Sequence, residues 1–189
     1  MKRVVMMGPP GAGKGTQGAL LALALGVNRY STGEILREAR AAGSKLGLEA
    51  KSFMDAGELV PDEVMLGIID EALASPEASP GYVLDGFPRT VAQADGLNAM
   101  LERAGRPLDA VILLEVADDE LVRRLSGRSL VDGRADDAPE TVLRRLAVYA
   151  EETEPVVEWY RGTAVPVLSI DGSGSIETVQ SSIQGQLGV

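Results

Sequence analysis

One segment constrains this chain of 189 residues more than any other, and it reads GPPGAGKGT over residues 8–16. It follows a short apolar run, Val4–Met7, and leads into a segment of helical composition, Lys14–Leu25. Glycines let the backbone turn its N–H groups inward around an anion, and the N-terminus of the next helix adds partial positive charge. Lys14 can reach a β- or γ-phosphate as a point charge. The segment therefore predicts a phosphate-binding loop rather than an ordinary glycine-rich turn between a strand and a helix.

Short apolar runs alternate with helical segments along the whole chain, which predicts an α/β fold with a parallel sheet. The runs are apolar throughout rather than alternating, so we expect helices on both faces of the sheet. Strands are predicted at Val4–Met7, Tyr82–Leu84, Ala110–Leu114 and Val165–Ile170, with a weaker candidate at Val27–Ser31. Helices are predicted at Lys14–Leu25, Glu34–Ala41, Leu46–Ala56, Asp62–Ala74, Val91–Ala104, Glu120–Ser126, Glu140–Tyr160 and Ile176–Leu187. Loops are expected at Ser75–Gly81 and at Ser126–Pro139, which is polar and charged.

Composition excludes several classes of function. The chain has no cysteine and no histidine, so thiol catalysis, Ser-His-Asp triads and Cys/His zinc sites are impossible. The net charge of −10 argues against nucleic acid as a partner, because such proteins carry a basic face. No apolar run is long enough for a signal peptide or a membrane helix, so we expect a cytoplasmic protein without a membrane partner.

Five motifs, in order along the chain, resemble those of the adenylate kinases and related nucleoside monophosphate kinases. The first is the phosphate loop itself, in its G-K-G-T form. The others are STGEILR at residues 31–37, GELVPD at 57–62, DGFPRT at 85–90 with a following glutamine, and a set of arginines from residue 128 to residue 145. The resemblance covers residues 4 to about 175. It implies a P-loop NTPase-type fold with five parallel strands and the reaction MgATP + AMP ⇌ MgADP + ADP.

The resemblance also implies an ATP side and a metal site. ATP would be held by Gly11, Ala12, Gly13, Lys14, Gly15, Thr16, Arg124, Arg128 and Gly174. Mg²⁺ is the implied cofactor, with Asp85 acting through waters. Gly15 stands where the usual phosphate loop has Ser or Thr, so the hydroxyl is displaced to Thr16, a possible ligand, and we expect largely water-coordinated Mg²⁺.

On the acceptor side, arginines would grip the AMP phosphate, and Thr32 and Gln93 would read the base. The residues implied for AMP are Thr32, Arg37, Glu58, Leu59, Val60, Gly86, Phe87, Pro88, Arg89, Gln93, Arg134 and Arg145. The catalytic cations would be Lys14, Arg89, Arg124, Arg128, Arg134 and Arg145, since phosphoryl transfer asks mainly for positioning and charge neutralisation. Two arginines have simpler readings: Arg37 could pair with Glu34 along a helix, and Arg124 could lie on a solvated face.

Three regions are expected within the chain. Residues 1–30, 61–126 and 138–189 would form the core, residues 31–60 a helical AMP-binding segment, and residues 127–137 a short lid without a zinc site. Asp136 and Asp137 would latch the lid through arginines, or equally cap the helix that follows. A monomer acting on ATP, AMP and ADP is expected from the family.

Three other functions remain open, and one local feature has no assigned role. A kinase for GMP, UMP or CMP would share most motifs, and a catalytically inactive nucleotide-binding protein would share all of them. A GTPase-like switch predicts N-K-x-D, but neither Asn28 nor Asn98 is followed by lysine. Residues 20–25 are apolar all round, so this helix is either buried more fully than usual or leaves an exposed patch.

Overall fold

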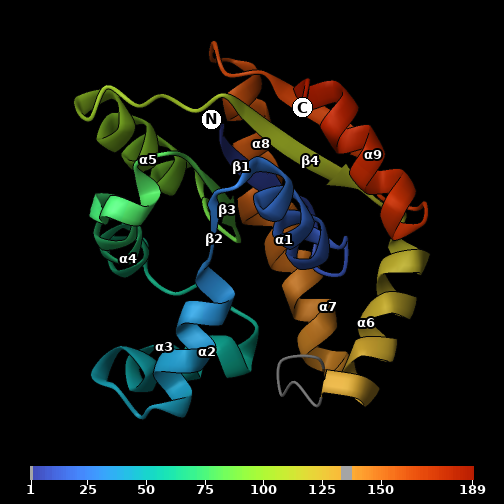
Figure 1. The fold of residues 1–189 in the computed structure, drawn as a ribbon. Helices are drawn as coiled ribbons and strands as arrows, with labels where there is room; N and C mark the ends of the chain where they lie inside the picture. Colours follow the sequence, from blue (N-terminus) through green and yellow to red (C-terminus); the bar gives the residue numbers. More distant parts are fainter. Residues whose placement is uncertain (1, 133–137) are drawn as a thin grey trace.

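Five parallel strands form a single sheet with the order β2-β3-β1-β4-β5. The computed structural model describes residues 2–132 and 138–189, with residues 128–132 and 139 described by their backbone alone. The strands are β1 (Arg3–Met7), β2 (Asn28–Ser31), β3 (Tyr82–Asp85), β4 (Ala110–Glu115) and β5 (Val167–Asp171). The predicted parallel α/β fold is confirmed, and the weaker strand candidate is β2 (Figure 1).

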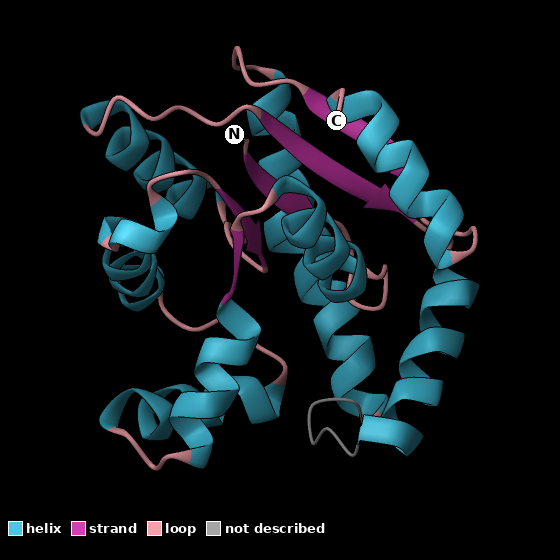
Figure 2. Cartoon of the chain, in the orientation of Figure 1, coloured by secondary structure: helices cyan, strands magenta, loops and turns pink. Residues whose placement is uncertain are grey.

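Helices cover both faces of the sheet (Figure 2). Alternate residues of β1, β3 and β4 face the two resulting cores. Val4 and Met6 of β1 join the core under α1 (Lys14–Leu25) and α9 (Ile176–Leu187). Their neighbours in β1 join the opposite core, under α4 (Asp62–Ala74), α5 (Val91–Arg103) and α8 (Glu154–Arg161). This two-sided burial explains why the strand sequences are continuously apolar.

The apolar stretch in α1 divides between the core and the surface. Leu21 has no exposed surface and Ala22 is 5% exposed, whereas Leu23 is 81% exposed. Residues 20–25 therefore leave apolar side chains exposed and are not buried more fully than usual, because a helix lying on a sheet buries only one stripe of side chains.

Two helices, α2 (Thr32–Ala41) and α3 (Lys45–Ala56), project from the end of β2 before the chain returns to the sheet in α4. The side chain of Ser31 accepts the Glu34 backbone N–H, which starts α2 two residues earlier than predicted. A Cβ on Gly47 would lie 2.2 Å from the carbonyl of Ala39, so α2 and α3 pack backbone against backbone there. A short 3₁₀ turn, η1 (Pro76–Ala78), lies in the expected loop before β3.

The predicted loop at residues 126–139 is wrong in its first half, because helix α6 (Asp118–Asp132) continues through it. Residues 126–132 hold one glycine, Gly127, and no proline, and a glycine inside a helix costs only about 1 kcal/mol. The helix predicted at Glu140–Tyr160 is α7 (Pro139–Val148), a π-helical turn η3 (Tyr149–Thr153) and then α8. Pro155 accounts for the irregular turn, since its ring clashes with a carbonyl one turn earlier and it donates no hydrogen bond. Across the described ranges, no helix combines the length and apolar character needed to span a membrane.

Candidate functional site

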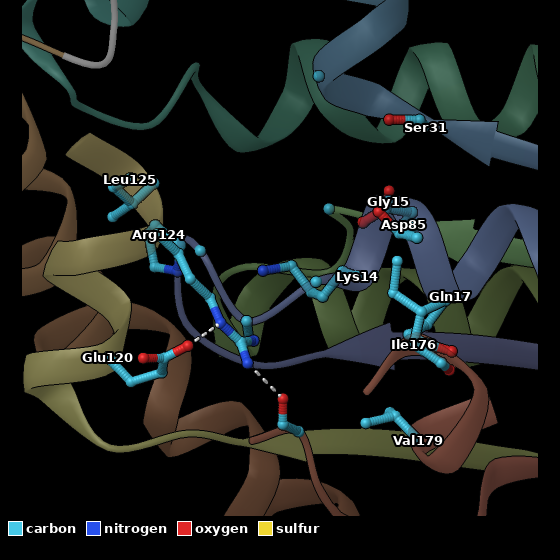
Figure 3. A pocket seen from close by; sticks show the side chains of 18 of the residues that line it. Lys14, Gly15, Gln17, Ser31, Asp85, Glu120, Arg124, Leu125, Ile176 and Val179 are labelled. Atoms are coloured by element: carbon cyan, nitrogen blue, oxygen red, sulfur yellow. Dashed lines mark hydrogen bonds and ion pairs between the residues drawn. The ribbon is translucent and has the colours of Figure 1, made fainter. Parts of the chain in front are cut away.

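A cleft of about 820 Å³ lies at the carboxyl edge of the sheet, where open α/β folds bind ligands (Figure 3). The predicted phosphate loop lines it between β1 and α1. Gly8, Gly11 and Gly13 all have positive φ, at 136°, 87° and 96°. A Cβ on Gly8 would also lie 2.6 Å from the Leu114 carbonyl oxygen, so this turn requires glycine. The loop therefore passes close over β4 before it enters α1.

Lys14 begins α1, and its ammonium folds back against the loop. The Nζ atom donates hydrogen bonds to the carbonyl oxygens of Gly8 at 2.6 Å and Pro9 at 2.8 Å. Figure 3 shows Lys14 between Arg124 of α6 on one side and Asp85 of β3 on the other. The positive charge is thus held at the floor of the cleft.

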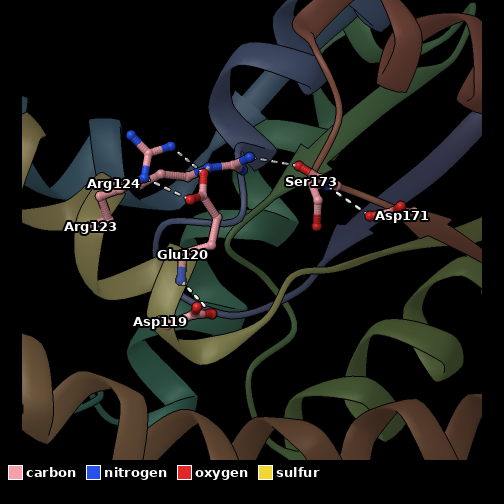
Figure 4. Close-up of polar contacts among 7 residues, drawn as sticks. Asp119, Glu120, Arg123, Arg124, Asp171 and Ser173 are labelled. Atoms are coloured by element: carbon pink, nitrogen blue, oxygen red, sulfur yellow. Dashed lines mark hydrogen bonds and ion pairs between the residues drawn. The ribbon is translucent and has the colours of Figure 1, made fainter.

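Arg124 is tethered across the cleft from α6 to the loop after β5 (Figure 4). Its Nε donates to Glu120 at 2.6 Å, and its Nη2 donates to the carbonyl oxygen of Gly172 at 2.9 Å. Arg123 also donates hydrogen bonds to Glu120. The hydrogen bonds from Arg123, followed by the one from Arg124 as the smaller contribution, lower the pKa of Glu120 to about 2. The side chain of Arg123 is 75% exposed, against 25% for Arg124. Both arginines line the cleft, together with Gly174, but the side chain of Arg124 is largely covered, so the solvated-face reading does not fit Arg124.

The opposite wall is built from the ends of β2 and β3. Thr32 is 1% exposed, and its hydroxyl donates to the Gly86 carbonyl oxygen at 2.8 Å. Arg89 donates from Nε to the same oxygen at 2.8 Å. The carbonyl of Arg89 accepts from the hydroxyl of Thr153 at 2.8 Å, which ties the strand end to the π-helical turn. Predicted cations from distant parts of the sequence line this one cleft: Lys14, Arg37, Arg89, Arg124 and Arg145.

A smaller cavity adjoins this wall, and most of the residues implied for AMP line it. They are Thr32, Arg37, Glu58, Leu59, Val60, Gly86, Arg89, Gln93 and Arg145. Pro88 lines a third cavity nearby, while Phe87 is 1% exposed and packs within the core. Arg128 belongs to α6, and the structure describes only its backbone. Arg134, Asp136 and Asp137 lie outside the described residues.

Comparison with known proteins agrees with this geometry. The family model described as Adenylate kinase matches residues 6–165. The chain belongs to the adenylate kinase family. It is 46% identical to an adenylate kinase from Gemmatimonas aurantiaca over 209 residues, which covers 97% of this chain and 98% of the relative. It is 47% identical to one from Stenotrophomonas maltophilia, with 96% of each chain covered, and 46% identical to one from Leptospira biflexa, with 97% and 98% covered. The chain is thus a phosphotransferase of the nucleoside monophosphate kinase type.

The donor atoms at the edge of β3 suit the magnesium ion that adenylate kinases use with ATP. Asp85 is 7% exposed, and a Cβ on Gly15 would lie 3.7 Å from its Oδ2, so the carboxylate sits directly beside the phosphate loop. Thr16 lines the same cleft with an exposed hydroxyl. Oxygen ligands of this kind fit Mg²⁺, which keeps several waters and takes phosphate oxygens as further ligands. In the described part of the chain, no group of three or more acidic residues is placed to hold a metal alone.

Sequence reasoning missed one residue whose side chain reaches this edge, Arg29, the second residue of β2. Its Nη1 donates to Asp85 at 2.8 Å, and its Nη2 donates to Glu34 at the start of α2. Burial opposes the charge of Arg29, but the hydrogen bonds and charges of the two acids leave its pKa raised. The side chain also packs against Gly18 of α1, where an added Cβ would meet it at 3.2 Å. The sequence carries one signal that could have identified Arg29, which is a cation on a strand that runs parallel to the strand ending in Asp85.

Proposed function

We propose that this chain transfers the γ-phosphoryl group of MgATP to AMP and yields two ADP, with the cleft residues in the roles given below. One observation carries the assignment: the phosphate loop and the acceptor-side arginines, Arg37 and Arg89, line the same cleft. A nucleotide donor and a monophosphate acceptor would thus meet head to head. The family membership supports the same reaction.

On the donor side, backbone N–H groups of residues 11–16 would bind the phosphates at the N-terminus of α1. Lys14 would place its charge between the β- and γ-phosphates, and Arg124 would support the donor nucleotide from α6. The loop around Gly174 would contact the donor base through its backbone. Arg128, carried on α6, would reach the transferring group when residues 127–137 close over it.

On the acceptor side, Arg37 and Arg89 would bind the AMP phosphate through paired N–H groups. An oxygen of that phosphate attacks the γ-phosphorus, the new P–O bond forms, and the bond to the β-phosphate oxygen of ADP breaks. The attacking oxygen is already an anion, so no side chain has to remove a proton. Arg89 and Arg145 would stabilise the charge that develops between the two nucleotides. Arg134 is proposed for the same task.

Mg²⁺ would bind with ATP, and it would supply charge neutralisation on the β- and γ-phosphate oxygens. Asp85 would hold waters of that ion, with Thr16 as a possible direct ligand. Arg29 would keep the Asp85 carboxylate pointed along the edge of β3. Thr32 and Gln93 would contact the AMP base.

Two segments would move during turnover: residues 31–60 over the acceptor and residues 127–137 over the donor. Closure would exclude water, which protects the γ-phosphoryl group from hydrolysis. The first segment already reaches α7, because Arg144 donates to Glu58 at 3.3 Å. A Cβ on Gly57 would also lie 3.1 Å from the side chains of Thr141 and Arg145.

We further propose that the protein is a monomer and that it acts in the cytoplasm, where free nucleotides occur. Light scattering of the purified protein tests the monomeric state.

A coupled assay with ATP and each of AMP, GMP, UMP and CMP tests the proposed substrate. We expect kcat/KM for AMP to exceed the other three values. A clear preference for UMP or CMP would reassign the chain to another branch of the monophosphate kinases. A folded protein that binds ATP but transfers phosphate to none of the four would establish an inactive nucleotide-binding protein.

A further inference from the structure

The side-chain amide of Gln93 is held at both ends inside the protein. Gln93 is 1% exposed and lies in the first turn of α5. The backbone N–H of Arg89 donates to its Oε1 at 2.7 Å. Its own Nε2 donates to Oδ1 of Asp62, the first residue of α4, at 2.8 Å. The amide therefore spans two elements that come from separate parts of the sequence.

These two contacts allow only one orientation of the amide. A backbone N–H needs an acceptor, which the amide oxygen provides, and a carboxylate needs a donor, which the amide nitrogen provides. After a flip, the Gln93 oxygen would face the Asp62 carboxylate and its NH₂ group would face the Arg89 N–H. Both contacts would then be repulsive, in a buried site where an unmet hydrogen bond carries its full cost.

Thr90 strengthens this arrangement. Its hydroxyl accepts the Gln93 backbone N–H at 3.1 Å and donates to the same Asp62 oxygen at 3.1 Å. Asp62 thus accepts two hydrogen bonds, and a carboxylate has no hydrogen with which to donate one instead.

The amide keeps one N–H and one oxygen lone pair that these contacts do not use. Gln93 lines the smaller cavity, beside Thr32 and Val60. The two edges of a purine differ in a way that a fixed amide can read. Adenine presents an amino group that donates and an N1 that accepts, whereas a 6-oxopurine presents a carbonyl that accepts and an N1–H that donates.

We propose that Asp62 is a specificity-determining positioning residue, which locks the Gln93 amide in the orientation that fits adenine and rejects 6-oxopurines. The inference rests on the proposed AMP site. Asp62 acts through Gln93 and does not touch the base itself. A 6-oxopurine would need the flipped amide, and the carboxylate makes that flip unfavourable.

The test compares AMP with IMP, which has the same ribose and phosphate and differs at the purine edge that Gln93 reads. Asp62→Asn is nearly isosteric, and its amide can donate to a flipped Gln93. We expect the ratio of kcat/KM for AMP to that for IMP to fall on the order of 10-fold in this variant, with kcat for AMP close to wild type. The matched control is Asp70→Asn, an exposed change in the same helix, which should leave the ratio unchanged.

A general weakening of the pocket would lower both kcat/KM values together, so equal losses or an unchanged ratio in Asp62→Asn would overturn the inference. Such a result would leave the proposed function intact, whereas a wild-type protein that does not phosphorylate AMP would overturn that function instead.

A second measurement needs no turnover. In ¹⁵N-labelled wild-type protein, the Gln93 side-chain amide protons, identified by their loss in Gln93→Leu, should lie farther apart in chemical shift than those of an exposed glutamine, with one shifted downfield by the carboxylate. Shifts typical of a freely rotating glutamine would also overturn the inference.

Discussion

The two sides of the cleft, which we propose bind the donor and the acceptor, are built from different chemical groups. The donor side is backbone and charge: a glycine loop, an exposed Thr16 and an arginine whose side chain is 25% exposed. The acceptor side is made of buried side chains that hydrogen-bond to one another, with Thr32 and Gln93 each 1% exposed. Backbone N–H groups recognise any polyphosphate, whereas a buried amide with fixed partners recognises one arrangement of donors and acceptors. The difference suggests that rate depends on cations from both sides, whereas base selectivity depends on the acceptor side.

The largest effect is expected where the two sides meet. Arg89→Ala should lower kcat on the order of 10²–10³-fold, because it removes a guanidinium from the charge that develops during transfer. The arginine is placed for this by its bond to Gly86 at the end of β3. Steady-state kinetics measure the loss, with Arg103→Ala at the exposed end of α5 as control. A kcat within about threefold of wild type would remove Arg89 from the reaction centre.

Lys14→Ala tests the donor side alone. We expect kcat to fall by about 10²-fold, because a positive charge on the phosphates is lost, while the preference among monophosphates stays as in wild type. Lys45→Ala, whose side chain is 91% exposed, is the matched control. A change in base preference in Lys14→Ala would contradict the division between the two sides.

Gln93→Ala tests the acceptor side alone. The loss of the amide should raise KM for AMP about 10-fold and relax base choice, with a smaller change in kcat. Kinetics with AMP, GMP and CMP provide the measurement, and KM for ATP serves as the internal control. If base preference is unaltered, Gln93 does not read the base.

The smallest effect is expected at Glu120, whose pKa is lowered to about 2 by Arg123 and Arg124. Because this pKa lies below its ordinary value of 4.5, the ion pairs stabilise the fold fully above that pH. Their contribution is lost as the pH falls toward 2. Thermal unfolding of Glu120→Gln near neutral pH should show a melting temperature lower than wild type by roughly 1–2 °C, since ion pairs that water can reach contribute little.

That difference should narrow as the pH is lowered below about 4.5, because acid neutralises Glu120 in the wild type as the substitution does in the variant. A gap that widens on acidification would contradict the assigned ion pairs. Glu102→Gln, on an exposed glutamate of α5, provides the control.

Much of the fold could be predicted from the sequence, because burial on both sheet faces leaves a continuous apolar signal in the strands. The weakest candidate, β2, carries Arg29 and Tyr30 and still forms, since pairing with β3 outweighs its local preference. The end of α6 could not be predicted, because its polar residues suit an exposed helix as well as a loop. The π-helical turn ends two residues before Pro155, and a proline marks a break in a helix without specifying the turn that results.

The residues that line the two cavities were predictable where a motif names them, as for Lys14, Thr32, Arg89 and Gln93. The contacts among those residues were not, because they depend on which strand ends become neighbours in the sheet. Asp62 lies 31 positions from Gln93 and Arg29 lies 56 positions from Asp85, so no local pattern joins either pair. The same reason explains why Arg123 and Arg124, adjacent in sequence and both bonded to Glu120, differ in exposure, and why Arg124 also reaches Gly172.

The central claim is that this cleft moves a phosphoryl group between two adenine nucleotides. The most direct measurement is ³¹P NMR of the purified protein with ADP as the sole nucleotide, with and without Mg²⁺. We predict that ATP and AMP appear in equal amounts when Mg²⁺ is present, and that Arg89→Ala slows their appearance on the order of 10²–10³-fold. Release of inorganic phosphate in place of ATP, or stable ADP with folded protein and Mg²⁺, would contradict the account.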